Sequence, residues 1–299
     1  MTGIYRRMIV NQENSLVGGK NMSAFMKLNM WRLEQKIMLF TYRIIAVACL
    51  TAPAFAQNFS ATALTTENQQ KIELAVWKYA IDTPLLLNTI DWFRDLTRNS
   101  RESAAVAELS RLEFMRAQLE LDKNRRIQLF ENCVAIANQS LALNANDVRG
   151  LFWKAAAMGK MAEDSGIVDA LRMIGPMEKM LLKVVALDEK YENAGAHRAL
   201  GRIYHKLPGF PISFGSNQKA LMHMKRAHEL FPRDVITRAF YAELLYDVGR
   251  KEEARKHADF VLATPIADED ALEFSEYVDI ALDVIKRTGG SEFNRVGNY

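Results

Sequence analysis

Three neighbouring side chains could bind an anionic group on a partner. His197, Arg198 and Arg202 fall within one short stretch, and a spacing of four residues places the two arginines on the same face of a helix. Arginine forms paired hydrogen bonds with carboxylates, so this face could recognise an acidic group. The alternative is that Arg198 pairs inside its own fold, for instance with Glu178 or Glu229.

Residue types used in metal and nucleophilic chemistry occur, but not at the spacings that this chemistry needs. No two histidines are four residues apart, and the chain lacks His-Glu-x-x-His, Cys-x-x-Cys and Gly-x-Ser-x-Gly. Cys133 falls at a small-residue position of a predicted helix, which favours a packed thiol. The sequence therefore predicts no metal, no cofactor and no enzyme activity. The histidines are His197, His205, His223, His228 and His257.

A second candidate site is a loop between two predicted helices, residues 207–215, with two prolines, two glycines and two phenylalanines. Proline restricts the unfolded chain, and water disfavours exposed aromatic area, so we expect the loop to be ordered. Phe210 or Phe214 should pack beside the helix of Arg198 and Tyr204. Two interpretations remain open: the aromatics border a binding site, or they close the end of the hairpin.

These candidates lie on helices that repeat a pattern. A large apolar residue, a small residue and an aromatic recur on one helix, and small and large residues followed by proline recur on the next. This is typical of tetratricopeptide repeats, in which the small residue lets the two helices approach closely. The first unit holds Leu200, Gly201, Tyr204, Ala220, Met224, Ala227 and Pro232, and the next holds Tyr241, Ala242, Gly249, Ala254, Ala258 and Pro265.

The repeats differ in length along the chain. The closing positions Leu143, Leu187 and Leu230 are 44 and 43 residues apart, against about 34 in a standard repeat. The two middle hairpins are therefore enlarged, and the excess in the second of them falls in the loop of residues 207–215. We expect an all-α helical-hairpin solenoid of the tetratricopeptide type with enlarged middle repeats and a C-terminal capping helix.

Apolar periodicity and capping residues set the other predicted elements. Thr83-Pro84 suits a helix start, Ser100 is a predicted N-cap, and Asp147 is predicted to cap the helix that follows it. The predicted helices before the repeats of residues 194–265 cover 67–78, 84–97, 100–121, 125–143, 148–163 and 169–187, and the capping helix covers 268–287.

The charge is unevenly distributed. Residues 1–56 hold 7 Lys and Arg against 2 Asp and Glu, which leaves 32 against 34 in the remainder. The part that folds is therefore close to neutral. It has no basic face that would suit a nucleic acid, so a nucleic-acid partner is not expected.

The N-terminus resembles a targeting segment. Arg32, Lys36 and Arg43 precede the apolar run 44–50, and Ala54-Phe55-Ala56 supplies small residues for a signal peptidase. We expect cleavage after Ala56 and export, into the periplasm or otherwise, without a membrane span in the mature chain. Residues 57–287 should form one helical domain and 288–299 a disordered tail.

Two points about this segment stay open. Translation could begin at Met30 or Met38, because residues 1–37 are long and polar for a signal peptide. A lipoprotein attached through Cys49 is the alternative to a cleaved signal peptide, although Ala46 stands where leucine is usual.

Residues 194–204, followed by a Pro/Gly loop, Lys219-Ala220 and Ala227, resemble the TRAP transporter T-component family of tetratricopeptide proteins. The stretch from Trp153 to Glu189 resembles that family's preceding hairpin, and the likeness covers roughly residues 148–262. It implies a helical periplasmic protein whose partner is a substrate-binding protein. It also implies that apolar ligands could be accommodated in a central channel.

We therefore predict an exported, non-catalytic protein that binds a partner protein or extended peptide as an accessory component of periplasmic solute uptake. The alternative is a carrier of a small apolar molecule in the concave channel. An apolar cavity lined by Trp153, Met173, Met177 and Tyr204 would favour the carrier, and a polar groove would favour the binding scaffold. The predicted binding residues are Trp153, His197, Arg198, Arg202, Tyr204, Phe210 and Phe214.

The first prediction concerns the mature N-terminus. Because basic, apolar and small residues succeed one another up to Ala56, the protein from its native host should begin at Gln57. Edman degradation or mass spectrometry of the purified protein measures this. An uncleaved N-terminus on protein from the cytosolic fraction would contradict it.

Overall fold

The computed structural model describes residues 62–209, 211–265 and 271–289. The predicted signal peptide lies outside these residues, as do residues 268–270 of the predicted capping helix and residues 290–299 of the predicted tail. The following description concerns the helical unit that contains all the described residues.

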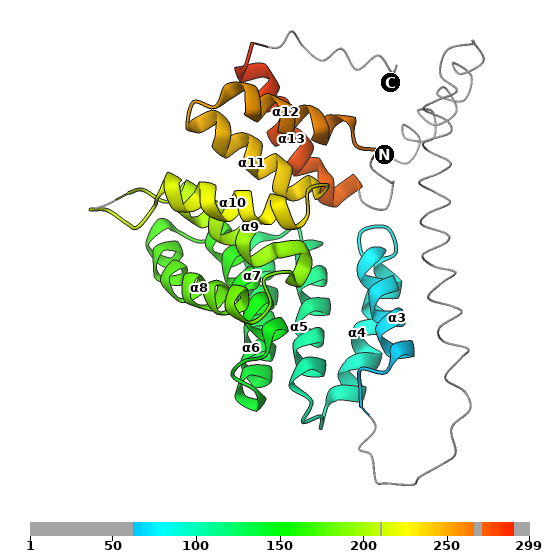
Figure 1. Ribbon diagram of the computed structural model, residues 1–299. Helices are drawn as coiled ribbons and strands as arrows, with labels where there is room; N and C mark the ends of the chain where they lie inside the picture. Colours follow the sequence, from blue (N-terminus) through cyan, green and yellow to red (C-terminus); the bar gives the residue numbers. More distant parts are fainter. Residues whose placement is uncertain (1–61, 210, 266–270, 290–299) are drawn as a thin grey trace, which may run out of the picture. The chain divides into compact units, whose positions relative to one another are not determined.

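The described part consists of helices without strands, and each helix packs against the next one in the chain (Figure 1). This confirms the predicted all-α class. The helices are α3 (Thr66–Trp77), α4 (Thr83–Thr97), α5 (Ser103–Gln118), α6 (Lys123–Leu143), α7 (Val148–Asp164), α8 (Ile167–Leu187), α9 (Tyr191–Lys206), α10 (Asn217–Leu230), α11 (Val235–Asp247), α12 (Lys251–Ala263) and α13 (Ala271–Arg287).

Capping residues explain most helix starts. The Asp147 carboxylate accepts a hydrogen bond from the Gly150 amide at 3.0 Å, as predicted. The prediction of Ser100 as an N-cap is wrong, because α5 begins at Ser103 with Glu102 at its N-cap. Ser100 Oγ instead accepts a hydrogen bond from the Glu102 amide at 3.1 Å, and the Glu102 carboxylate accepts one from the Thr62 hydroxyl at 2.9 Å.

The odd-numbered helices form one side of the array. Apart from contacts within hairpins, α5 packs against α7, α9 against α11, and α11 against α13. We call the side formed by α3, α5, α7, α9 and α11 the inner face, because the first helix of each hairpin lines the inner curve of a repeat array. The even-numbered helices then form the outer face.

Two hydrophobic cores meet at α5. Leu86, Ile90 and Phe93 of α4 pack with Ile72 of α3 and with the first turns of α5. Phe114 and Ala117, at the end of α5, belong to the larger core that continues through α13. Helix α5 is consequently buried on most of its circumference, and the charged residues that it carries must find partners inside the fold.

Gly201 marks the close contact between α9 and α10. A Cβ atom built on Gly201 would lie 2.7 Å from Met224 Cγ, and both residues are buried. The predicted register, in which a small residue faces the second helix of its hairpin, is therefore correct.

Gly201→Leu should lower the free energy of unfolding by several kcal/mol, because the new side chain would overlap the buried Met224. Thermal and urea unfolding of the purified variant measure the change. Gly175→Leu is the matched control, since Gly175 also lies inside a helix and a Cβ built on it meets nothing within 4 Å. A loss in the control that equals the loss in Gly201→Leu would contradict the packing argument.

Candidate functional site

Two of the predicted site residues lie in the packed interior. Trp153 is 5% exposed, and its indole N–H donates a hydrogen bond to the Tyr191 hydroxyl at 3.0 Å. Tyr204 is 2% exposed and donates its hydroxyl hydrogen to a Glu178 carboxylate oxygen at 2.5 Å. Neither ring lines an open apolar channel.

The two predicted arginines join α9 to α11. Arg198 Nη1 donates to Asp234 Oδ2 at 3.2 Å, so Arg198 does pair within the fold, but with Asp234 rather than Glu178 or Glu229. Arg202 pairs with Glu243, and its guanidinium lies over the Phe240 ring, 4.4 Å from the ring centroid. Both cations are therefore largely neutralised by the next hairpin.

His197 belongs to a buried pair of histidines. Its Nδ1 lies 2.9 Å from His223 Nδ1, one ring donating and the other accepting. Two further histidine rings, His228 of α10 and His257 of α12, lie 4.8 Å apart where one hairpin meets the next, and their Nδ1 atoms have no hydrogen-bond partner among the described residues. Burial lowers the pKa of all four rings, and those of His223 and His257 fall to about 4. Neutral imidazoles thus pack within the α9–α10 hairpin and between α10 and α12.

The loop between α9 and α10 is closed at its base. The Gly215 amide donates to the Pro208 carbonyl at 3.0 Å, and a Cβ on Gly215 would lie only 1.9 Å from the Leu207 carbonyl oxygen. The Phe214 ring packs edge-on against Tyr204, with 6.2 Å between centroids, as predicted for one of the two phenylalanines. Phe210 lies outside the described residues. The connection projects from the helices (Figure 1), and Ile212 on it is 76% exposed.

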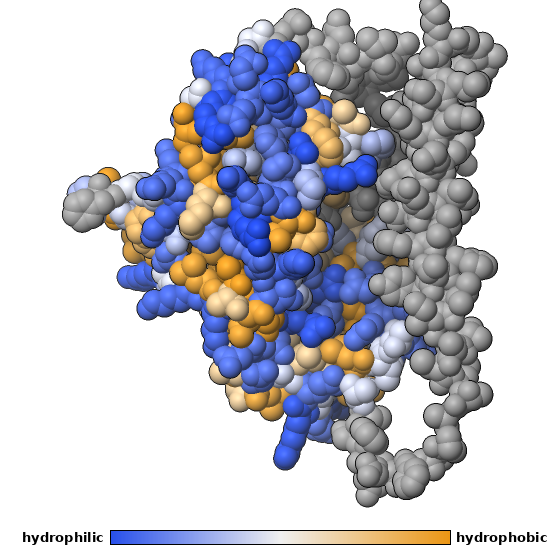
Figure 2. Space-filling view, in the orientation of Figure 1, coloured by the Kyte–Doolittle hydropathy of each residue, from blue (hydrophilic) through white to orange (hydrophobic). Residues whose placement is uncertain are grey.

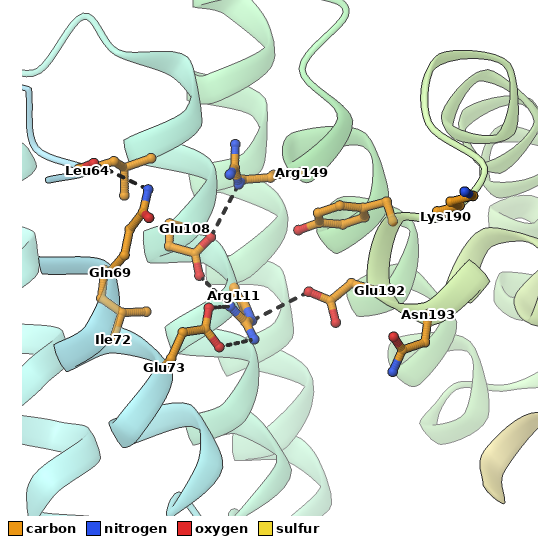
Figure 3. Close-up of a pocket in the computed structure, with 11 residues that line it drawn as sticks. Leu64, Gln69, Ile72, Glu73, Glu108, Arg111, Arg149, Lys190, Glu192 and Asn193 are labelled. Carbon is orange, nitrogen blue, oxygen red and sulfur yellow. Dashed lines mark hydrogen bonds and ion pairs between the residues drawn. The ribbon is translucent and has the colours of Figure 1, made fainter. Parts of the chain in front are cut away.

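A pocket that the sequence did not predict opens on the inner face. Its volume is about 370 Å³, and most of its lining is charged or polar (Figure 3). Residues from α3, α5, α7, the start of α9 and the segments just before α3 and α9 line it: Leu64, Gln69, Ile72, Glu73, Glu108, Arg111, Arg149, Lys190, Tyr191, Glu192 and Asn193.

Arg111 is the centre of this pocket. Its side chain is 11% exposed, and Nη1 donates to Glu73 at 2.6 Å and to Glu108 at 2.8 Å. Nε has no hydrogen-bond partner among the described residues, and the nearest carboxylate oxygen is Glu192 Oε1 at 3.7 Å. Figure 3 shows Glu73 and Glu192 pointing toward Arg111 from opposite sides. Three carboxylates thus surround one guanidinium.

Glu192 sits on an unusual turn. Glu192, Asn193 and Ala194 have φ values of 50°, 53° and 60°, a left-handed conformation that costs non-glycine residues about 1–3 kcal/mol each. Arg198 braces the turn by donating to the carbonyl oxygens of Asn193 at 3.3 Å and Glu192 at 3.5 Å. Burial, reinforced by Glu108 and Glu73, raises the pKa of the Glu192 carboxyl.

One signal in the sequence could have indicated the pocket. Glu108, Arg111 and Glu113 occur on a helix whose other residues are mostly apolar or small, and all three are largely buried. Charges on a buried helix need partners from other elements, which marks their surroundings as unusual. Glu192 gave no comparable signal, because its role depends on the left-handed turn.

The described residues contain neither a metal-binding group nor a helix that could cross a membrane. Residues 62–209, 211–265 and 271–289 contain no group of three or more His, Cys, Asp or Glu side chains that could hold a metal. None of the helices searched there is long and apolar enough to cross a bilayer. Figure 2 shows hydrophobic residues among hydrophilic ones on the visible face, and α8 exposes Val168, Leu171 and Leu182.

Comparison with known proteins agrees with this architecture. The family model described as TRAP transporter T-component matches residues 95–273. TTC0263, a thermophilic TPR protein of Thermus thermophilus, has a similar solved structure, with a TM-score of 0.51 and 18% identity over 72% of this chain and 99% of that one. YrrB, a TPR protein with an unusual peptide-binding site, gives a TM-score of 0.40 and 15% identity over 66% and 90% of the two chains. No curated protein sequence matches the chain.

The buried histidines should make the protein less stable in acid. His223 and His257 have a pKa of about 4 in the folded chain against an ordinary 6.5, so below about pH 6.5 the unfolded chain binds more protons. The stabilisation is complete above pH 6.5 and is lost as the pH falls toward 4, on the order of 2 kcal/mol for each ring. Urea unfolding at about pH 7.5 and about pH 5 measures the difference.

This pH window separates the histidines from the carboxylates. The hydrogen bond from Arg126 lowers the pKa of the Asp164 carboxyl below its ordinary value, outside this window, and Glu192, with its raised pKa, acts in the opposite direction. His223→Gln should therefore lose less stability between the two pH values than the wild type. Equal stability of the wild type at both would show that the histidines do not control it.

Proposed function

Since the chain belongs to the TRAP transporter T-component family, we propose that it is an exported, non-catalytic accessory component of a solute-uptake system. It binds a partner protein, the substrate-binding protein of the transporter, through the inner face. The helical repeats are those of binding scaffolds, and the proposed export into the periplasm agrees with the family's link to transport.

The charged pocket is the observation that carries this proposal. A carrier of apolar molecules needs a cavity with predominantly apolar walls. Of the four residues expected to line such a channel, Trp153, Met177 and Tyr204 are at most 7% exposed, and Met173 is half-buried. The pocket on the inner face holds Glu73, Arg149 and other charged groups, which favour a polar contact with a partner.

Within this proposal some of the residues predicted from the sequence position the site, and others stabilise the helices behind it. Arg198 and Trp153 position the site, because Arg198 braces the turn of Glu192 and Trp153 holds the Tyr191 hydroxyl. His197, Arg202 and Tyr204 stabilise the helices behind it. The residues that contact the partner directly lie at the rim of the pocket, where the side chains of Arg149 and Lys190 are exposed. Phe214, in the loop between α9 and α10, is a further candidate for contact.

Replacing Arg149 and Lys190 together by alanine should weaken binding to the substrate-binding protein about tenfold or more, because exposed charges at the centre of a contact control encounter and specificity. Biolayer interferometry with the purified substrate-binding proteins of the host's TRAP transporters measures the dissociation constant. Arg149 contacts Glu108 at 3.6 Å only, and Glu108 keeps Arg111, so the variant should fold.

The matched control replaces Lys179 and Lys225, which are exposed on α8 and α10 of the outer face, and it removes the same charge. Its dissociation constant should equal that of the wild type. If only the outer-face variant binds more weakly, the partner contacts the outer face and the proposed site is wrong. The absence of binding to any of these proteins would refute the proposed partner.

A further inference from the structure

We propose that the pocket around Arg111 accepts a positively charged group, an alkylammonium or a guanidinium, with the Glu192 carboxylate as its main acceptor. The placement of this contact on the inner face rests on the proposed function. The ligand chemistry rests on the charges and distances in the pocket itself.

Three carboxylates surround Arg111 inside the pocket. Glu73, Glu108 and Glu192 approach this guanidinium from three elements, at 2.6, 2.8 and 3.7 Å. Arg149 also lines the pocket, and its Nε lies 3.6 Å from Glu108 Oε2. Lys190 also lines the pocket, so three carboxylates face three cations over the whole lining. The carboxylates are in excess only directly around Arg111, and an added cation is attracted there.

Arg111 already uses both terminal nitrogens in hydrogen bonds inside the pocket. Nη1 and Nη2 already donate to Glu73, and Nη1 also donates to Glu108. An anionic ligand would have to displace one of these carboxylates, leaving it without its partner. Nη1 and Nη2 of Arg111 are therefore already occupied, and the unpartnered Nε faces the Glu192 carboxylate, which would repel an external anion.

Glu192, by contrast, still has room for a donor. Its nearest cationic atom, Arg111 Nε, is 3.7 Å away, beyond hydrogen-bond distance, and no described residue donates a hydrogen bond to its carboxylate. The side chain is 29% exposed, so a ligand can reach it from the pocket. A carboxylate in this situation gains a charge-assisted hydrogen bond when a cation binds.

The backbone of Glu192 is held in a fixed turn. The left-handed turn of residues 192–194 is strained, and such strain persists only where surrounding contacts impose it. Arg198 holds the carbonyl oxygen of Glu192 at 3.5 Å, and Trp153 holds the hydroxyl of Tyr191, the residue before it. The backbone that carries the Glu192 carboxylate is thus fixed before a ligand arrives, which lowers the entropy lost on binding.

The pocket also suits the shape of such a ligand. Leu64 and Ile72 offer apolar wall, whereas the amides of Gln69 and Asn193 offer further hydrogen-bonding groups. A volume of about 370 Å³ holds a short alkyl chain with a terminal cation. The same chemistry occurs in a free amine and in a lysine or arginine side chain of a bound protein.

The test uses agmatine, which carries an ammonium and a guanidinium, and the dianion glutarate as the opposite probe. Isothermal titration on the full chain should detect agmatine binding and no glutarate binding. Glu192→Gln keeps the shape of the side chain and should weaken agmatine binding about tenfold or more. Glu131→Gln, on the exposed surface of α6, should bind agmatine as the wild type does.

Two results would overturn the assignment: glutarate binds and agmatine does not, or Glu192→Gln binds agmatine with unchanged affinity while its circular dichroism matches the wild type. Blocked pentapeptides with a central lysine or a central glutamate distinguish the sources. Lysine-peptide binding at least as tight as agmatine binding assigns the pocket to a basic side chain of a protein. Agmatine binding without lysine-peptide binding assigns it to a free amine.

The proposed function can fail separately. Agmatine binding that depends on Glu192, in a chain that binds no substrate-binding protein, would keep the pocket assignment and reject the proposed partner. Binding of that partner without agmatine binding would keep the proposed partner and reject the pocket assignment.

Discussion

A guanidinium that is about nine-tenths buried must be matched by carboxylates, and the rest of the structure depends on how this requirement is met at Arg111. Its partners come from α3, from α5 itself and from the turn at the start of α9. The cluster therefore links α3 and α5 to the α9–α10 hairpin, which begins about eighty residues after Arg111. A pocket with charged walls is the structural consequence.

The same principle operates between successive hairpins. Arg198 reaches Asp234, Arg226 reaches Glu189, and Arg126 reaches Asp164, with 36 to 38 residues between the partners. This separation is close to one repeat, so the charged side chains of one hairpin are neutralised by its neighbour. It explains why the arginines of α9, which look free in the sequence, are engaged within the fold.

Much of the fold could be predicted because its determinants are local. The α-helical periodicity, the Asp147 cap and the small residue at Gly201 act over a few residues or within one hairpin. The pocket could not be predicted in this way, because Arg111 meets Glu73 across 38 residues and Glu192 only through a left-handed turn without glycine. Nothing in the sequence near Arg198 showed that its partner would be Asp234, and Ser100 failed as a cap because Glu102 lies closer to the helix start.

The central claim is that the partner protein binds over the pocket on the inner face. Hydrogen–deuterium exchange of the full chain, with and without the substrate-binding protein, tests it most directly. The account predicts slower exchange in α3, in the first turns of α5 and in residues 190–194, with α8 and α12 unchanged. Protection confined to α8, α10 and α12 would contradict it, because the partner would then occupy the outer face.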